Sequence, residues 1–225
     1  MKPLDICTFS TTNLKISSFT LFEQSIKTYI HDNMSVDILS LTTGLIVIFK
    51  ALFGQKDTIR HAHALYGVVV ARARDAVLFH HYSIPDTLDG RFEALIMHLY
   101  VLHARLKDEN LQARKISQRV FDLFIDDMDA ALREAGVGDQ VVPKRIAKMT
   151  QVFYGRTGAY EDALASSNPI EELTAVIDRN LFPTKRAPEL AKEIAIYFYA
   201  QVEDLGNKNL EMITAQYAIF DQPIQ

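Results

Sequence analysis

The sequence predicts an all-α fold, a single domain of about seven to nine helices behind a less ordered N-terminal extension. Apolar residues recur at helical spacing almost without a break from about residue 57 onward. The nine glycines and seven prolines lie mainly between these helical patterns. No alternating strand pattern of useful length and no internal repeat is present, so we expect helices throughout the body of the chain.

The N-terminal region differs from this body. Residues 1–33 are rich in Ser and Thr, and Arg60 is the first arginine, so the Arg-rich composition of a mitochondrial presequence is absent. Residues 38–54 are apolar but shorter than the ~20 residues that span a bilayer. We therefore predict an extension over residues 1–45, whose partly apolar final helix packs on the body or lies on a membrane surface, and a helical domain over 46–225.

Capping residues and helix breakers place the helices in order. Thr87 or Asp89 can cap the second helix, Gly136 can end the third, and Pro143 suits the first position of the fourth. Asn168, followed by Pro and Glu, resembles a capping box at a later start. The helices are expected at about residues 58–80, 89–106, 109–135, 143–155, 158–166, from 168 onward, 188–204 and 207–219.

The composition excludes several functions. A formal charge of −4 argues against a generally basic nucleic-acid binder, and we expect no sequence-specific nucleic-acid partner. Cys7 is the only cysteine, so neither an intrachain disulfide nor a Cys-based metal site can form. A reducing compartment fits this cysteine usage best.

The histidines and acidic residues do not form a convincing metal site. His98 and His103 are five residues apart, about 140° around a helix, too far for chelation from one face. His103 falls on the apolar stripe and is expected to be a hydrogen-bonded core histidine, whereas His98 lies off that stripe. Asp122 and Asp126 share a face, which leaves a helical metal-dependent hydrolase as an alternative, but a solvated helix face explains them better. We expect no catalytic residue, no metal and no cofactor.

Charged residues around the second predicted helix suggest a structural clamp. Arg72 falls on the apolar face of the helix at 58–80, and a buried arginine needs a carboxylate partner. Asp86 and Asp89 lie a short turn further on and could supply it. Arg91 is unfavourably placed for the helix dipole, which suggests that an acidic residue or a partner holds it. These four residues are predicted to join helices.

A second polar stretch suggests a partner surface. Lys144, Arg145, Lys148 and Arg156 occur in residues 142–160 before any acidic residue appears. Such a basic stripe in an acidic protein could meet anionic lipid headgroups or RNA phosphates, although a solvated helix face is an equal alternative. The residues expected to contact a partner are Lys144, Arg145, Lys148, Tyr154, Arg156 and Tyr160.

Three linked segments resemble the ubiquinol–cytochrome c chaperone family. They are IPDTLDGRFEALIMHLYVLHARL, the LREAGVGD turn with its PKRIAKM continuation, and YGRTGAY. They occur in the order and spacing of the family, and the resemblance extends over residues 58–200. It implies an assembly factor without catalytic residues or cofactors, whose members engage newly made cytochrome b during biogenesis of ubiquinol–cytochrome c reductase.

The resemblance also implies where such a protein acts and with what. Mitochondrial members work in the matrix with a small partner protein near the ribosomal exit, and a bacterial member would be cytoplasmic or peripheral on the inner face of the cytoplasmic membrane. We expect an apolar surface, rimmed by the basic stripe, that shields a nascent membrane helix. A peripheral membrane scaffold without a client is the other alternative.

Overall fold

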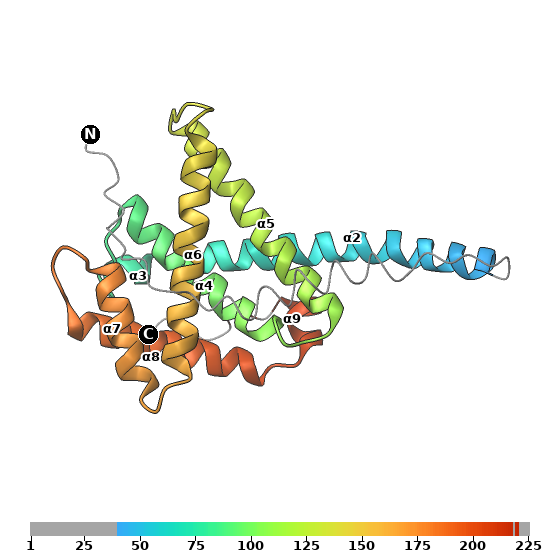
Figure 1. Cartoon of the computed structure of the whole chain (residues 1–225). Helices are drawn as coiled ribbons and strands as arrows, with labels where there is room; N and C mark the ends of the chain where they lie inside the picture. Colours follow the sequence, from blue (N-terminus) through green and yellow to red (C-terminus); the bar gives the residue numbers. More distant parts are fainter. Residues whose placement is uncertain (1–39, 218, 221–225) are drawn as a thin grey trace. The chain divides into compact units, whose positions relative to one another are not determined.

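Helices make up the regular structure of the described part of the chain, and the predicted all-α class is confirmed (Figure 1). The computed structural model describes the backbone of residues 40–217 and 219–220, and most side chains from residue 56 onward. The extension predicted over residues 1–45, and the packing of its apolar helix, therefore lie almost entirely outside the described residues. Residues 51–225 form one compact unit.

The helix order gives the bounds against which the sequence can be compared. The helices are α2 (Ser40–Ala73), α3 (Ala76–His80), α4 (Leu88–Leu106), α5 (Leu111–Glu134), α6 (Val142–Leu164), α7 (Pro169–Leu181), α8 (Pro188–Asn207) and α9 (Leu210–Gln216). Most of the predicted starts agree to within a few residues, because side-chain caps and prolines define them locally.

The helix predicted over 58–80 is wrong at its C-terminal end. α2 ends at Ala73, and α3 begins at Ala76. Between them Asp75 accepts a hydrogen bond from the backbone N–H of Val77 at 3.0 Å, which caps the new helix. An aspartate that bonds to nearby backbone competes with helix continuation, so the apolar periodicity passes through a break that it does not reveal.

The two helices predicted over 143–155 and 158–166 are one helix, α6. Gly155 and Gly158 suggested a break, yet an interior glycine costs a helix only ~1 kcal/mol relative to alanine. Phe153 and Tyr160 lie on the same face and are both buried, so their packing offsets that cost.

α4 lies at the centre of the unit. Every residue from Glu93 to Leu102 is buried, and the helix contacts α5, α6, α7 and α8. The sequence-based view of α4 assumed one exposed face and placed His98 off the buried stripe. With neighbours on several sides the helix has no exposed face there, and His98 is only 1% exposed. His103 is the less buried of the two histidines, and its Nδ1 lies 3.0 Å from Ser117 Oγ.

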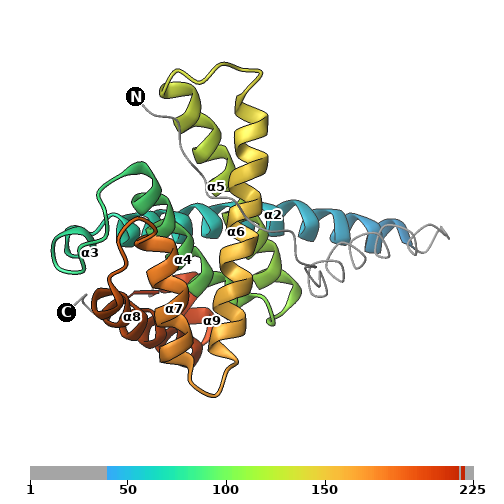
Figure 2. The same cartoon turned by 60° about the vertical axis from the view of Figure 1, so that its left-hand side comes forward.

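α5 and α6 form an antiparallel hairpin whose turn extends away from the remaining helices of the unit (Figures 1 and 2). Leu132 and Val142 are buried next to this turn, but they lie outside the core cluster that the other buried apolar residues form. Arg133 bonds to both Asp129 and Asp139, which fastens the turn. The outer half of the hairpin therefore packs mainly on itself.

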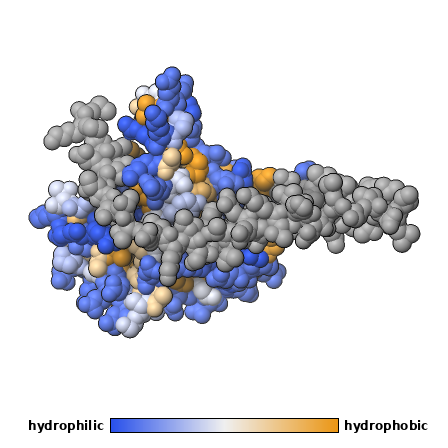
Figure 3. Space-filling model, in the orientation of Figure 1, coloured by the Kyte–Doolittle hydropathy of each residue, from blue (hydrophilic) through white to orange (hydrophobic). Residues whose placement is uncertain are grey.

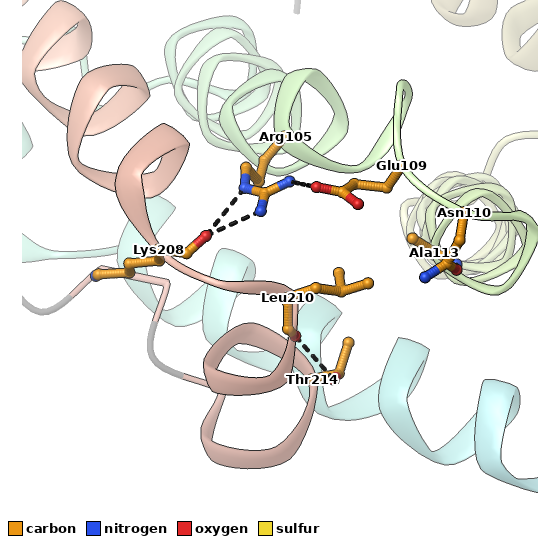
Figure 4. A network of polar contacts seen from close by, with 7 residues as sticks. All are labelled: Arg105, Glu109, Asn110, Ala113, Lys208, Leu210 and Thr214. Carbon is orange, nitrogen blue, oxygen red and sulfur yellow. Dashed lines mark hydrogen bonds and ion pairs between the residues drawn. The ribbon is translucent and has the colours of Figure 1, made fainter.

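Arg105 ties the end of α4 to the turn between α8 and α9 (Figure 4). Its Nε and Nη2 donate to the carbonyl oxygen of Lys208 at 3.3 and 2.9 Å, and it also pairs with Glu109. Beyond α9, the ring of Phe220 lies 5.3 Å from that of His98. The C-terminal segment thus covers one side of the α4 core.

Candidate functional site

The segment from Pro85 to Arg91 is a turn that starts α4. Thr87 Oγ1 accepts a hydrogen bond from the N–H of Gly90 at 3.2 Å and caps the helix. A Cβ atom on Gly90 would lie 2.0 Å from the carbonyl oxygen of Pro85. Only glycine allows this approach, so the motif is explained by backbone geometry.

The predicted clamp divides into two separate places, because Asp86 pairs with Arg91 whereas Arg72 donates to Tyr197. Arg91 Nε donates to Asp86 at 2.6 Å, and both side chains are more than half exposed. The bond from Arg91 holds the pKa of Asp86 below its ordinary value. Asp89 begins α4 nearby, on an exposed position, and partial desolvation raises the pKa of its carboxyl group.

Arg72 takes part in a polar chain that crosses three helices. Its Nε donates to the hydroxyl of Tyr197 on α8 at 3.0 Å, and that hydroxyl lies 2.8 Å from His98 Nε2. His98 Nδ1 is 2.7 Å from the carbonyl oxygen of Ala94, so Nδ1 carries the proton and Nε2 accepts from Tyr197. Burial lowers the pKa of His98 to about 4, which keeps the ring neutral at physiological pH.

Arg156, predicted to contact a partner, lies inside the protein instead. Its Nε and Nη2 donate to Glu93 at 2.8 to 3.0 Å, with side-chain exposures of 17% and 8% for the two residues. Burial raises the pKa of Glu93, and Arg156 opposes that rise. The sequence search missed Glu93, although its position on the apolar face of α4 was a signal that it needed a cation.

Tyr160 is also a core residue rather than a surface contact. It is 2% exposed, and its ring packs at 5.5 Å from Tyr100 and 4.9 Å from Phe198. Burial raises the pKa of its hydroxyl strongly. The YGRTGAY segment therefore supplies α6 with two residues that fasten it to the core.

The remaining predicted contact residues stay accessible on α6. Lys144 is exposed, and Arg145, Lys148 and Tyr154 are half-buried. Tyr154 belongs to an aromatic cluster at the base of the hairpin, where its ring lies 5.8 Å from that of Phe121. The other rings of this cluster are those of Phe92, Phe124 and Phe153.

The register of the hairpin follows from this cluster. Phe121 packs on Phe153 at 5.0 Å, and in an antiparallel pair a step of four residues places Ile125 opposite Met149, and a further step of three places Met128 opposite Ile146. These four middle residues, the hairpin seam, are all half-buried, whereas Leu132 and Val142 close the seam at the turn. Hydrophobic surface is visible on the projecting hairpin among hydrophilic side chains (Figure 3).

The acidic residues of α5 do not converge on a ligand position. Asp127 accepts a hydrogen bond from Tyr66 on α2 at 2.9 Å, and Gln118 donates to Asp122 at 2.9 Å. Across the described residues, no three His, Cys, Asp or Glu side chains are grouped closely enough to hold a metal ion. Over the same part of the chain, no helix has the length and apolar character needed to cross a bilayer.

Comparisons with known proteins converge on one family. The model of the ubiquinol-cytochrome C chaperone family matches residues 80–220. The ubiquinol-cytochrome c reductase complex assembly factor 1 of Mus musculus is 24% identical over 130 residues, which cover 57% of this chain and 43% of that protein. The corresponding factor of Xenopus laevis is 24% identical over 117 residues, covering 52% of this chain and 58% of that protein. The chain thus spans about half the length of the curated relatives it matches.

A solved structure agrees with this match. The crystal structure of the Cbp3 homolog from Brucella abortus has a TM-score of 0.70 and 32% sequence identity. The similarity covers 80% of this chain and 97% of that one. Because the family model spans more than half of the sequence, this chain belongs to the ubiquinol-cytochrome C chaperone family.

Proposed function

We propose that this chain is a non-catalytic assembly chaperone that binds newly made cytochrome b and supports the biogenesis of ubiquinol–cytochrome c reductase. Its family membership supports the role in assembly. The observation that carries the client-binding part is the hairpin seam, where Ile125, Met128, Ile146 and Met149 all remain half-buried although Ile125 and Met128 also pack against the core.

An open seam of this kind fits an apolar client helix. Two antiparallel helices shield only part of each other's apolar side chains, and a third helix laid along the seam covers the rest. Methionine suits such a surface because its flexible, polarizable side chain adapts to different apolar partners. Met128 and Met149 supply two of the four seam positions, so the seam can accept helices that differ in detail.

The rigid base of the hairpin supports the same function. Glu93 and Arg156 anchor α6 to α4 through two guanidinium nitrogens, and the aromatic cluster fills the space between α4, α5 and α6. The seam is therefore presented by a fixed stem, which lowers the entropy lost on binding. Lys144, Arg145, Lys148 and Tyr154 lie along the same hairpin outside the seam, and we assign them to contact with a partner other than the client helix. The site of action is the cytoplasm or the inner membrane face of a bacterium, or the mitochondrial matrix.

Site-specific photo-crosslinking in cells tests this proposal. A crosslinker at Met149 should capture cytochrome b while its synthesis continues. A crosslinker at Ile196, an apolar residue of α8 that is 51% exposed, is the matched control and should capture little. Equal capture at both positions would show that exposure alone governs the reaction. Absence of cytochrome b from the Met149 product would contradict the proposed client.

Deleting the gene gives an independent test at the level of the enzyme complex. Cytochrome b should fail to accumulate while its transcript persists, because the protein acts after translation. Normal levels of cytochrome b in the deletion strain would contradict the proposal. Restoring the gene with Ile196→Ser should rescue accumulation, which makes that variant the control for expression.

A further inference from the structure

The geometry points to a second surface on the hairpin, one that docks on an anionic membrane. It consists of Val141, Lys144, Arg145, Lys148 and Val152, which we call the basic face of α6. Val141, Lys144, Lys148 and Val152 follow one another at spacings of three or four, and Arg145 lies four residues after Val141, so all five lie along one side of the helix. Val141 is 45% exposed, Lys144 is exposed, and the other three are half-buried.

The basic face lies on the side of α6 that contacts α4 nearer the core. Arg156 lies one turn beyond Val152 on the same side, and there it is covered by α4 through Glu93. Nearer the turn, Lys144, Arg145 and Lys148 form no ion pair with any residue that the structure describes. The side of α6 that α4 covers at Arg156 therefore carries three available cations further out.

The charge along this face is not neutralised locally. From Val142 to Tyr160, α6 contains no acidic residue. Asp129 and Asp139, the acidic groups nearest the turn that have a recorded partner, both bind Arg133. Glu134, at the end of α5, is an exposed acidic residue close by. Three cations on one helix face thus outnumber the acidic groups that remain to oppose them.

The apolar residues of the face distinguish a membrane from a nucleic acid. Val141 stands exposed at the outer end of the face, where its side chain can enter the headgroup region while the charges meet lipid phosphates, whereas Val152 at the inner end packs against the core. Proteins that hold single-stranded RNA place aromatic rings among the cations so that bases can stack. The basic face contains none, so an anionic lipid surface fits its chemistry better.

Vesicle co-sedimentation of the full chain tests this inference. Wild-type protein should sediment with vesicles of phosphatidylcholine and phosphatidylglycerol, should not sediment with phosphatidylcholine alone, and should be released by salt. Each cation removed should weaken binding about fivefold, so Lys144→Gln, Arg145→Gln and Lys148→Gln together should weaken it roughly a hundredfold. Val141→Ser should weaken it further at high salt, where the apolar contribution remains.

A charge-matched variant separates this face from the overall charge of the protein. Arg114→Gln, Lys115→Gln and Lys192→Gln together remove three exposed cations elsewhere and should leave sedimentation unchanged. Equal losses in both triple variants would overturn the inference, as would no sedimentation of the wild type. Binding of wild-type protein to polyuridylate without binding to vesicles would also overturn it, in favour of RNA.

The inference can fail independently of the proposed client. The Lys144, Arg145 and Lys148 triple variant should still crosslink to detergent-solubilised cytochrome b from Met149, because the seam is intact. If that crosslink is absent in the wild type while vesicle binding follows the expected pattern, the client is wrong and the membrane surface stands.

Discussion

The core around α4 and the outer half of the α5–α6 hairpin differ in how they use polar side chains. In the core, Glu93 pairs with Arg156 and His98 hydrogen bonds to Tyr197, so the buried polar groups join one helix to another. In the outer hairpin, Arg133 pairs with Asp129 and Asp139, whereas Lys144, Arg145 and Lys148 form no ion pair among the described residues, and the seam stays half-buried. On the proposed function, the core supplies stability and the outer hairpin supplies contact surface.

Breaking the ion pair at the base of the hairpin should have the largest effect. Arg156→Ala leaves the Glu93 carboxylate buried without its partner and should lower the free energy of unfolding by ~4 kcal/mol. Urea denaturation followed by circular dichroism measures this change. The double variant Glu93→Leu, Arg156→Leu should recover a large part of the loss. If the single variant cost no more than a surface substitution, the pair would not join the two regions.

The turn before α4 should come next. Gly90→Ala places a Cβ at 2.0 Å from the carbonyl oxygen of Pro85, and the resulting shift should cost ~3 kcal/mol of unfolding free energy. Gly155→Ala is the matched control, since a Cβ there meets nothing within 4 Å and should stabilise α6 by up to ~1 kcal/mol. The difference in urea midpoint between the two variants measures the effect. Similar midpoints would show that the turn tolerates a side chain.

His98 should make the stability of the core depend on pH. Its pKa falls from 6.5 to about 4 on folding, so the unfolded chain binds this proton first as the pH is lowered. The contribution is fully present above pH ~6.5 and is lost as the pH falls toward 4, a change of ~3 kcal/mol. His98→Gln keeps a donor for Ala94 and an acceptor for Tyr197 but cannot titrate. Its unfolding free energy should therefore fall less between pH 7 and 4, and parallel curves for both proteins would contradict the assignment.

Substitution in the seam should have the smallest effect on stability. Met149→Ser removes a half-buried side chain and should cost only ~1 kcal/mol. It should weaken capture of cytochrome b by a crosslinker at Ile125 by about tenfold, because it removes an apolar anchor of the client. Ile196→Ser, the control on α8, should change neither quantity by much. A large loss of stability with unchanged capture would reverse the roles of the two regions.

Local signals in the sequence accounted for the helical class and for most helix starts. Thr87, Asn110 and Asn209 each cap a helix by accepting a backbone hydrogen bond, and such caps act within a few residues. The break after Ala73, which periodicity missed, comes from the cap that Asp75 supplies, whereas the break expected near Gly155 is absent because packing favours a continuous helix. Periodicity reports the presence of an apolar face, but not how much burial that face obtains.

The candidate site divides in the same way. Lys144, Arg145 and Lys148 were identified from a run of cations without acids, which is visible in the sequence and agrees with their accessible positions. Arg156 and Tyr160 come from the same segment, but Tyr160 is buried and Arg156 is held by an ion pair with the buried Glu93. Nothing local distinguishes Arg156 from Lys148, since the difference is the presence of Glu93 at the facing point of α4.

By itself the sequence determined the all-helical class, most helix starts and the family, because each depends on residue types at short separations, whereas the cap predicted at Asn168 makes no side-chain bond to its helix. Only the tertiary structure decided which polar residues pair with one another inside the protein and which are accessible to a partner. That distinction arises between residues some sixty positions apart, such as Glu93 and Arg156, whose meeting depends on how α4 and α6 cross. A side chain is buried or exposed according to what lies opposite it, and no short stretch of sequence contains that information.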